Sequence, residues 1–396
     1  MNENNIIFNE IIDRTETQSA KWDEYDKEIL PLWVADMDFK SPQPIIDAIV
    51  QRAKHGIYGY SYFHDAYYDS VINWFKRHYN WAIDREWLTF TPGVIPAINL
   101  TIQAFSNPGD KVIVQNPVYY PFFGAIKENG RQILNNSLQF SDERYQMDFD
   151  DLEQKVKDPK AKIMILCNPH NPVGRIWTKE ELTCLGEICI ENEILIIADE
   201  IHCDLIYSNY NHTNFASISN DFALGSITCT SLSKTFNLAG LQLSNIIIPN
   251  KKIRQTFINC IRSVFIPEVY GYLPNSLSLA AFTAAFKECD EWLESLILYL
   301  ESNLEFLKSF LKEKLPQIKV IEPEGTYLVW LDFRKLSIPF EELEKFLHEE
   351  AKVALDDGSM FGKGGVGFQR MNIACPQSIL KEALNRIYKA VEKLKI

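Results

Sequence analysis

Lys234 is the residue of this chain with the clearest chemical potential. It lies just after an apolar, β-prone run at 227–230, and Ser231 and Ser233 place two hydroxyl groups immediately before it. Desolvation at the end of a buried strand lowers the pKa of a lysine and frees its amine to form a Schiff base with a carbonyl compound. Because Ser-x-Ser-Lys alone also fits an ordinary structural loop, the ends of the other apolar runs decide the interpretation.

Three of those runs end in groups that suit a phosphate or a flat ring. The run at 87–91 leads to Gly93 and a helix, and a glycine at a helix N-terminus leaves backbone N–H groups exposed to an anion. The run at 111–115 leads to Tyr119, which could stack on a ring or simply pack. The run at 162–167 leads to a turn with two prolines and a glycine, which would fix the direction of the Asn171 amide.

A fourth run, at 194–198, ends in Asp199. An unpaired buried charge is costly, so this carboxylate needs a partner, either an arginine or a protonated ring nitrogen. The strand ends together offer a phosphate cradle, a stacking aromatic ring, an amide, an acid and a lysine. This is the set of groups that holds pyridoxal 5′-phosphate (PLP), and we expect that cofactor.

The runs that carry these groups predict an α/β fold. They are nearly continuous in apolar residues, which is typical of strands buried on both faces of a parallel sheet. The expected strands are 87–91, 111–115, 162–167, 194–198, 227–230 and 245–248. Helical stretches separate most of them, for example 178–191 with Thr178 as N-cap. Such a fold binds ligands beyond the carboxyl ends of its strands.

The flanking segments predict a second, smaller domain. Ser41 followed by Pro42 predicts a helix start with Ser41 as N-cap. Leucines at helical spacing over 292–311 predict a long amphipathic helix, after which short strands and helices alternate. We expect a large PLP-binding α/β domain at 50–288 and a small α+β domain formed by 1–49 and 289–396.

Composition narrows the class of function. The chain has 396 residues and a formal net charge of −13, which argues against non-specific binding to nucleic acid or to anionic membranes. No apolar run approaches the length of a membrane span, and the polar N-terminus does not predict a secretory signal. The eight cysteines contain no C-x-x-C pair, so we expect a reduced, cytoplasmic protein without a structural metal.

The order of these motifs resembles one family over nearly the full length of the chain. The motifs are LPLWVADMDF at 30–39, NPHNPVG at 168–174, DEIH at 199–202, SKTFNLAG at 233–240, PEGTY at 323–327 and FQRMNIA at 368–374. The chain resembles the fold-type I PLP enzymes of the aminotransferase class I/II superfamily. This resemblance implies the aspartate aminotransferase fold, with a mainly parallel mixed sheet flanked by helices in the large domain and a smaller α+β domain. The chain is most similar to the C–S lyase branch, the cystathionine β-lyases.

The resemblance implies roles for particular residues. Lys234 would bind the cofactor aldehyde and Asp199 the ring nitrogen, while Arg370 would clamp the substrate carboxylate. The other implied cofactor contacts are Asn171 at the ring hydroxyl, Tyr119 on the ring, His202, and Gly93, Val94, Ser231 and Ser233 at the phosphate. Ala35 and Asn171 are expected beside the substrate. Tyr60 would reach the phosphate of a neighbouring subunit, which implies a homodimer.

Two positions depart from the aspartate aminotransferase pattern. His202 stands where that group has a tyrosine, and Gln242 stands where it has a phosphate-binding arginine. The change at Gln242 leaves less positive charge for the phosphate. From the sequence, His202 either touches the cofactor or supports Asp199.

The expected activity is a PLP-dependent β-elimination of S-substituted L-cysteines to pyruvate, ammonia and a thiol. Cystathionine is the expected substrate, with cystine, cysteine or a related conjugate as alternatives. In this interpretation the neutral amine of Lys234 removes the α-proton as general base. Two other functions stay open: an aminotransferase for neutral or aromatic amino acids, and a non-catalytic regulatory protein on the same fold.

Overall fold

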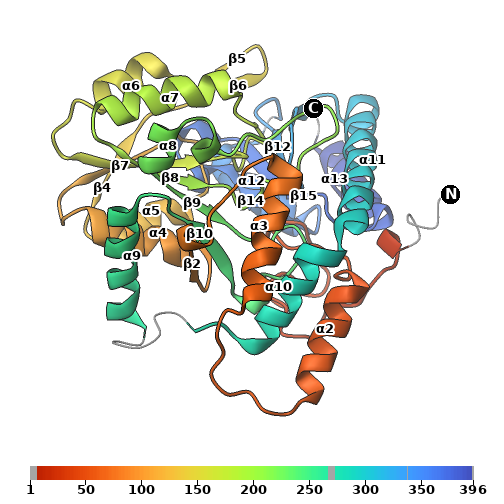
Figure 1. The fold of residues 1–396 in the computed structure, drawn as a ribbon. Helices are drawn as coiled ribbons and strands as arrows, with labels where there is room; N and C mark the ends of the chain where they lie inside the picture. The colour runs from red at the N-terminus through yellow and green to blue at the C-terminus, as the bar shows by residue number, and fades with distance from the viewer. Residues whose placement is uncertain (1–6, 266–272, 337, 395–396) are drawn as a thin grey trace.

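The computed structural model describes residues 7–265, 273–336 and 338–394. Its centre is a seven-stranded mixed sheet in the order β2-β10-β9-β8-β7-β3-β4 (Figure 1). The strands are β2 (Leu88–Thr91), β3 (Lys111–Val114), β4 (Gln132–Asn135), β7 (Ala161–Cys167), β8 (Leu195–Asp199), β9 (Ser226–Thr230) and β10 (Ser244–Ile247). Only β10 runs against its neighbours β2 and β9, and the other pairs are parallel. The sheet confirms the predicted α/β fold class.

Helices bury both faces of this sheet, as the continuous apolar runs predict. Along β7, Ile163 and Ile165 belong to one buried cluster, and the alternate residues Met164 and Leu166 belong to another. The first cluster includes α4 (Val94–Phe105), α5 (Pro121–Glu128) and α9 (Lys251–Val264), and the second includes α6 (Phe149–Lys155), α7 (Lys179–Glu191) and α8 (Asn220–Leu224). Figure 1 shows these two groups on opposite sides of the strands.

The six predicted strands all form, with bounds within one residue of those expected. The mixed sheet agrees with the fold implied by the family resemblance, but two of its features have no signal in the residues themselves. The edge strand β4 is only partly buried, so it lacks the continuous apolar run of the others. The reversed direction of β10 has no signal in composition, because a strand covered on both faces is apolar whichever way it runs.

The two predicted helix starts differ in outcome. Thr178 is confirmed as the N-cap of α7, where it forms a reciprocal capping box with Glu181. Ser41 as the N-cap of α2 (Gln43–Lys54) is wrong, since Pro42 occupies that position without a side-chain cap. The Ser41 hydroxyl instead donates to the Phe236 carbonyl at 2.9 Å, so a tertiary contact outweighs the local capping preference.

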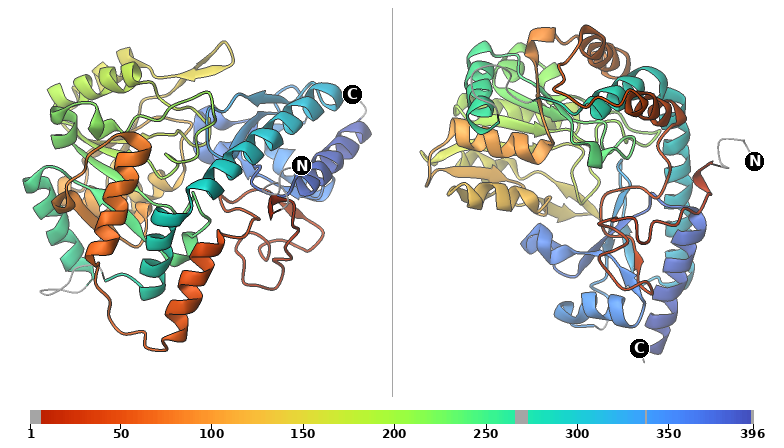
Figure 2. Two further views of the ribbon diagram at one scale, coloured as in Figure 1. Left: turned by 45° about the vertical axis from the view of Figure 1, so that its right-hand side comes forward. Right: turned by 90° about the horizontal axis from the view of Figure 1, so that it is seen from below.

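The rest of the chain packs around a second, antiparallel sheet in the order β11-β12-β15-β14. Its strands are β11 (Lys319–Ile321), β12 (Leu328–Asp332), β14 (Asp356–Asp357) and β15 (Phe368–Asn372), and they follow the predicted long helix α11 (Asp290–Lys314). The remaining helices here are α12 (Phe340–Glu349) and α13 (Gln377–Lys393). The N-terminal strand β1 (Leu30–Pro31) pairs with β13 (Val353–Ala354). Figure 2 shows the N-terminal segment beside the C-terminal part of the chain.

The helix α2 packs against α10 (Ser276–Glu288), which also contacts α3 (Asp65–Tyr79). The exact division of the chain into 50–288 and the flanking segments stays a prediction. Among the described helices, none is both long and apolar enough to cross a membrane. The described residues also contain no cluster of acidic, cysteine and histidine side chains suited to a metal ion.

Candidate active site

A cavity of about 210 Å³ lies at the carboxyl ends of β8 and β9 and at the start of α4. Eight of the residues predicted for the site line it: Ala35, Gly93, Val94, Tyr119, Asp199, His202, Ser233 and Lys234. Cys167 and Gln242 also line it. Four predicted residues, Tyr60, Asn171, Ser231 and Arg370, are not part of this lining.

Strand pairing explains why Asp199 and Lys234 meet. Asp199 is the last residue of β8 and pairs in register with Cys229 of the parallel strand β9. Lys234 follows β9 within a tight loop. The Ser231 hydroxyl shapes that loop, because it accepts from the Ser233 backbone N–H at 3.1 Å and donates to the Leu243 carbonyl at 2.7 Å. Parallel neighbours end at one edge of the sheet, so both groups reach the same cavity.

The amine of Lys234 is held by the N-terminal arm. Its Nζ donates to the Ala35 carbonyl at 2.8 Å, and the Tyr327 hydroxyl donates to the same oxygen at 3.1 Å. The side chain is partly exposed to the cavity but lies deep within the protein. Burial, with the nearby positive charge of Arg370, lowers the pKa of Lys234 to about 8. A neutral amine is therefore within easy reach near neutral pH.

Asp199 is a buried acid that has no salt bridge within the described part of the chain. The side chain is 4% exposed, and the Ile201 backbone N–H donates to Oδ1 at 3.1 Å. Burial, with a smaller contribution from Glu200, raises the pKa of this carboxyl to about 7. A cationic partner in the cavity would restore the ionised form. The protonated ring nitrogen of PLP is such a partner, so the site fits the cofactor here.

His202 is buried beside Tyr327, with ring centroids 6.0 Å apart. Burial, reinforced by the positive charge of Lys234, lowers the pKa of His202 to about 3, so the imidazole is neutral. Within the described residues its Nδ1 has no hydrogen-bond partner, and no hydrogen bond joins it to Asp199. These observations favour contact with a ligand in the cavity over support of Asp199.

One end of the cavity lies at the start of α4. Gly93 immediately precedes the helix, and a side chain there would crowd the Pro96 ring, whose Cδ would lie 3.3 Å from the added Cβ. Val94 begins the helix, so its first-turn N–H groups point to this end. Lys234 is the only lysine or arginine among the described residues that line the cavity. In the described lining, no arginine accompanies the helix N–H groups and the Ser233 hydroxyl.

Arg370 and Asn171 lie together just outside the lining. Arg370 stands on β15 and is 2% exposed, and its Nη1 donates to Asn171 Oδ1 at 3.0 Å. Its Nη2 donates to the Trp33 carbonyl at 3.1 Å and to the carboxylate of Asp356. Asp356 has no signal in the sequence pattern. Tyr327 ends the PEGTY motif, and its hydroxyl shares the Ala35 carbonyl with Lys234.

A buried ion pair holds Arg370 near the strand ends. Glu324, just before β12, accepts from Arg175 Nη1 at 2.7 Å, and Arg175 follows the turn that carries Asn171. The turn and the second sheet also meet closely, since a Cβ on Gly174 would lie 2.7 Å from Pro323 Cβ. Because β12 pairs with β15, this contact fixes the strand of Arg370 against the Asn171 turn.

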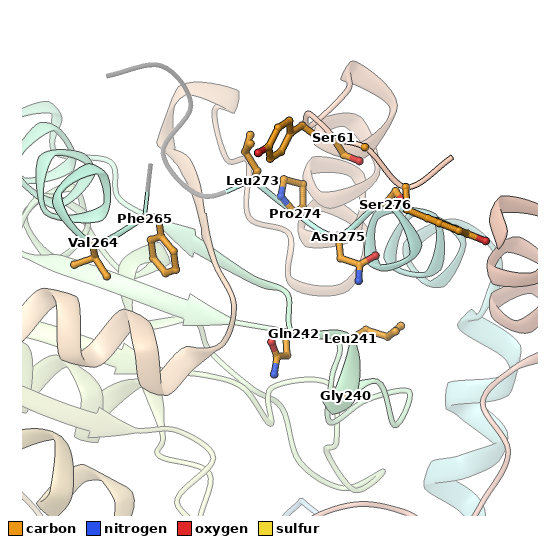
Figure 3. A pocket seen from close by; sticks show the side chains of 13 residues that line it. Ser61, Gly240, Leu241, Gln242, Val264, Phe265, Leu273, Pro274, Asn275 and Ser276 are labelled. Carbon is orange, nitrogen blue, oxygen red and sulfur yellow. The ribbon is translucent and has the colours of Figure 1, made fainter. Parts of the chain in front are cut away.

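Tyr60 lies apart from the other predicted residues. Its side chain is 86% exposed and lines a second cavity of about 730 Å³. Figure 3 shows this cavity, with Gln242 and Leu241 on one side and Pro274 and Asn275 on the other. Gln242 lines both cavities, so the two cavities are adjacent at this residue.

Known proteins are similar to this chain in sequence and in fold. The family model for aminotransferase class I and II matches residues 27–387. The chain is 42% identical to the cystathionine β-lyase PatB of Bacillus subtilis, over 97% of this chain and 99% of that protein. A PLP-bound protein of Clostridium difficile 630, provisionally described as an aminotransferase, has a TM-score of 0.94 and 45% identity, covering 97% of this chain and 99% of that one. The PLP-bound C–S lyase of Staphylococcus hominis has a TM-score of 0.92 and 34% identity, covering 98% and 100%.

A mixed α/β sheet with a desolvated lysine and a buried acid at its strand ends defines a PLP-dependent enzyme of this fold. The chain belongs to the aminotransferase class I and II family. PLP is its cofactor, in agreement with the residues that line the cavity.

Proposed function

We propose that this protein is a PLP-dependent C–S β-lyase that converts S-substituted L-cysteines to pyruvate, ammonia and a thiol. The observation that carries the proposal is the meeting of Lys234 and Asp199 in one cavity, in a chain 42% identical to a cystathionine β-lyase. L-cystathionine is the proposed substrate, with cystine, cysteine or another conjugate as alternatives.

Each end of the cavity has a separate task in this proposal. The N-terminus of α4 with Gly93, Val94 and Ser233 would hold the cofactor phosphate, Tyr119 would stack on the ring, and Asp199 would pair with the ring nitrogen. When bound, PLP supplies an aldehyde for the amino group and a cationic ring that withdraws electrons from Cα. Ser231 would act indirectly, because its hydroxyl is committed to the loop of Lys234.

The protein's own groups handle the substrate. Arg370 would bind the α-carboxylate, beside Asn171, and Ala35 would lie next to the substrate. The lowered pKa of Lys234 makes its Nζ a base able to take the α-proton at neutral pH. The Ala35 carbonyl, which accepts from Nζ at 2.8 Å, keeps the amine aimed into the cavity.

The experiment that tests the proposal is incubation of the holoenzyme with L-cystathionine and no keto acid. A β-lyase releases pyruvate over many turnovers, whereas a transaminase stops after one because nothing regenerates its cofactor. Pyruvate measured by lactate dehydrogenase coupling should exceed the enzyme concentration many times. Pyruvate that stops at or below one equivalent would reject the lyase assignment.

An aminotransferase is the second candidate function. Two similarities favour it: the provisional description of the Clostridium difficile protein, and 26% identity to an aspartate aminotransferase of Bacillus subtilis. Against it stand His202 and Gln242, which replace the tyrosine and arginine of the aspartate aminotransferase pattern. Measuring turnover with a panel of neutral and aromatic amino acids plus a keto acid separates the two activities.

We also propose a homodimer in which Tyr60 reaches the phosphate site of the partner. Tyr60 is 86% exposed, and it lies in a strip of exposed apolar side chains formed by Ile57, Tyr58, Tyr60 and Tyr62. A mass measurement in solution, by light scattering after gel filtration, should give twice the mass of the chain. A stable and active monomer would contradict the role of Tyr60. A cytoplasmic location likewise stays a prediction.

A further inference from the structure

The pair formed by Asp356 and Arg370 supports one further inference. The register of β14 and β15 places these two residues opposite each other, and the Asp356 carboxylate accepts a hydrogen bond from Arg370 Nη2. Their side chains are only 4% and 2% exposed. Arg370 is the residue proposed above to bind the substrate carboxylate, so the inference rests on the proposed function.

The donors of Arg370 are already occupied where a substrate would need them. A guanidinium group binds a carboxylate with two parallel N–H bonds, either from Nη1 and Nη2 or from Nε and Nη2. Both arrangements use Nη2. This nitrogen has two hydrogens and two acceptors, the Trp33 carbonyl at 3.1 Å and the Asp356 carboxylate. Neither two-bond arrangement is open to another carboxylate while both acceptors stay in place.

The other two nitrogens of Arg370 keep hydrogens that are not used within the described residues. Nη1 donates to Asn171 Oδ1 at 3.0 Å, which leaves it a second hydrogen. Nε is buried and has no hydrogen-bond partner among the described residues. The ring of Phe361 lies 5.0 Å from the guanidinium carbon and covers one face. An incoming carboxylate must therefore approach in the guanidinium plane and share or replace an acceptor at Nη2.

The charges of the two acceptors at Nη2 indicate which one an incoming carboxylate replaces. The Trp33 carbonyl is neutral and can stay beside a substrate carboxylate. Asp356 carries the same charge as the substrate carboxylate, and two anions sharing one nitrogen in a buried site repel each other. Burial also raises the pKa of Asp356, so its ionised form depends on Arg370.

We propose that Asp356 is an internal competitor for the substrate carboxylate. It neutralises and orients Arg370 in the absence of substrate, and it leaves Nη2 when the α-carboxylate binds. Asp356 is in this sense a positioning residue that acts through Arg370. It lowers the affinity for every carboxylate ligand while keeping the buried arginine paired.

The test uses the holoenzyme and its Asp356→Asn variant. Asparagine keeps an oxygen for Nη2 but removes the competing charge. The probe is 3-(methylthio)propionate, which has a carboxylate and a thioether but no amine to react with PLP. Its Kd, measured by isothermal titration calorimetry, should fall about fivefold or more in the variant. The KM for L-cystathionine should fall as well, with kcat changed by no more than about twofold.

Asp357→Asn is the matched control. It removes the same charge one residue along β14, where the carboxylate accepts from Gln369 Nε2 at 3.1 Å rather than from Arg370. Its Kd for the probe should equal that of the unaltered holoenzyme. An equal gain in both variants would mean a general effect of charge and would overturn the proposal.

Two further outcomes would overturn it. An unchanged or weaker Kd in Asp356→Asn would mean that Asp356 holds Arg370 for the substrate and does not compete. If this variant does not fold, a crystal structure of the unaltered holoenzyme with the probe decides the question. We expect the probe carboxylate on Nη2 and Asp356 turned away, and an intact Asp356–Arg370 contact would reject the proposal. The probe is not turned over, so a failed pyruvate assay would reject the lyase without affecting this comparison.

Discussion

Two buried acids of this protein, Asp38 and Asp199, have opposite surroundings. Asp38 is 2% exposed and bonds to Arg14 at 2.7 Å and to Lys21 at 2.8 Å, and Lys21 is itself fully buried. Asp199 is 4% exposed, and its Oδ1 accepts only from the Ile201 backbone N–H among the described residues. The first acid is saturated by its own chain. The second is left for a ligand.

The contrast separates a structural charge from a functional one. A buried carboxylate is stable when cations and donors surround it, and it is costly when they do not. The arm cluster, defined here as Arg14, Lys21, Asp36 and Asp38, meets that condition and fixes the segment that carries Ala35. The carboxyl of Asp199 does not meet it, and its raised pKa of about 7 marks the cavity as incomplete without a cation.

Among substitutions in the cavity, Lys234→Ala should cause the largest loss of activity. It removes both the amine that binds the cofactor aldehyde and the base that takes the α-proton. We expect pyruvate release from L-cystathionine to fall by about 10⁴-fold or more. The purified variant should also lose the visible absorbance of the lysine-bound cofactor. Measurable turnover close to that of the unaltered enzyme would reject the assigned role.

Asp199→Asn should reduce activity by about 10³-fold while the protein stays folded. The amide cannot stabilise a protonated ring nitrogen, so the ring withdraws electrons less strongly from Cα. The measurement is kcat for pyruvate release at saturating PLP. Asp38→Asn serves as the matched control, because it removes an equally buried charge outside the cavity. Equal losses of kcat in the two folded variants would remove the distinction between them.

The same two substitutions should affect stability in the opposite way, with the larger loss in Asp38→Asn. Asp38→Asn leaves buried cations with too few anions and should lower the free energy of unfolding by about 3 kcal/mol. With PLP removed, Asp199→Asn should instead raise Tm at pH 8 by roughly 2–4 °C, because it removes an uncompensated buried charge. Thermal scans of the PLP-free proteins measure both. A lower Tm for PLP-free Asp199→Asn would show that Asp199 has a partner in the protein.

The pKa of Asp199 also gives the PLP-free protein a predicted pH dependence. The folded-state pKa of about 7 lies above the unfolded value of 3.8, so the protonated acid favours the folded state. This contribution is full below about pH 4 and is lost as the pH rises to about 7, at a cost of at most about 4 kcal/mol. Urea titrations across this range should show the loss in the PLP-free protein but not in Asp199→Asn. If the difference in unfolding free energy between the two proteins did not change with pH, the raised pKa of Asp199 would be contradicted.

The surroundings of Asp199 in the cavity were easier to predict from the sequence than those of Asp38 in the arm cluster. Lys234 and Asp199 each follow an apolar strand, and parallel strands bring their ends together, so a local pattern was enough to place them. The bonds of Asp38 to Arg14 and Lys21 span 24 and 17 residues of irregular chain, and no periodicity links them. Asp356 was missed for the same reason, since its contact with Arg370 depends on the pairing of two strands.

The wrong prediction of Ser41 as a helix N-cap has a similar cause. Ser41 has the right residue type for an N-cap, yet its hydroxyl is used by Phe236, which lies 195 residues away. Tyr60 and Arg370 were identified through the family resemblance, but their surroundings follow from tertiary structure. Tyr60 lines a separate cavity, and the guanidinium group of Arg370 forms an ion pair with Asp356. Local chemistry thus predicted residues that gather at the strand ends, and long-range pairing decided which partners each residue contacts.

Among these substitutions, Gln242→Arg should have the smallest effect on function. It adds a cation to the cavity, whereas the arm cluster already contains Arg14 and Lys21. Gln242 lines the cavity near the start of α4, at the position where the aspartate aminotransferase pattern has an arginine. A guanidinium group there could donate charge-assisted hydrogen bonds to the cofactor phosphate. We expect the Kd for PLP, measured by fluorescence titration, to fall about fivefold. Gln242→Met, similar in size but uncharged, should not tighten binding. An unchanged Kd in Gln242→Arg would place the phosphate away from Gln242, because a cation beside a bound dianion cannot be neutral in its effect.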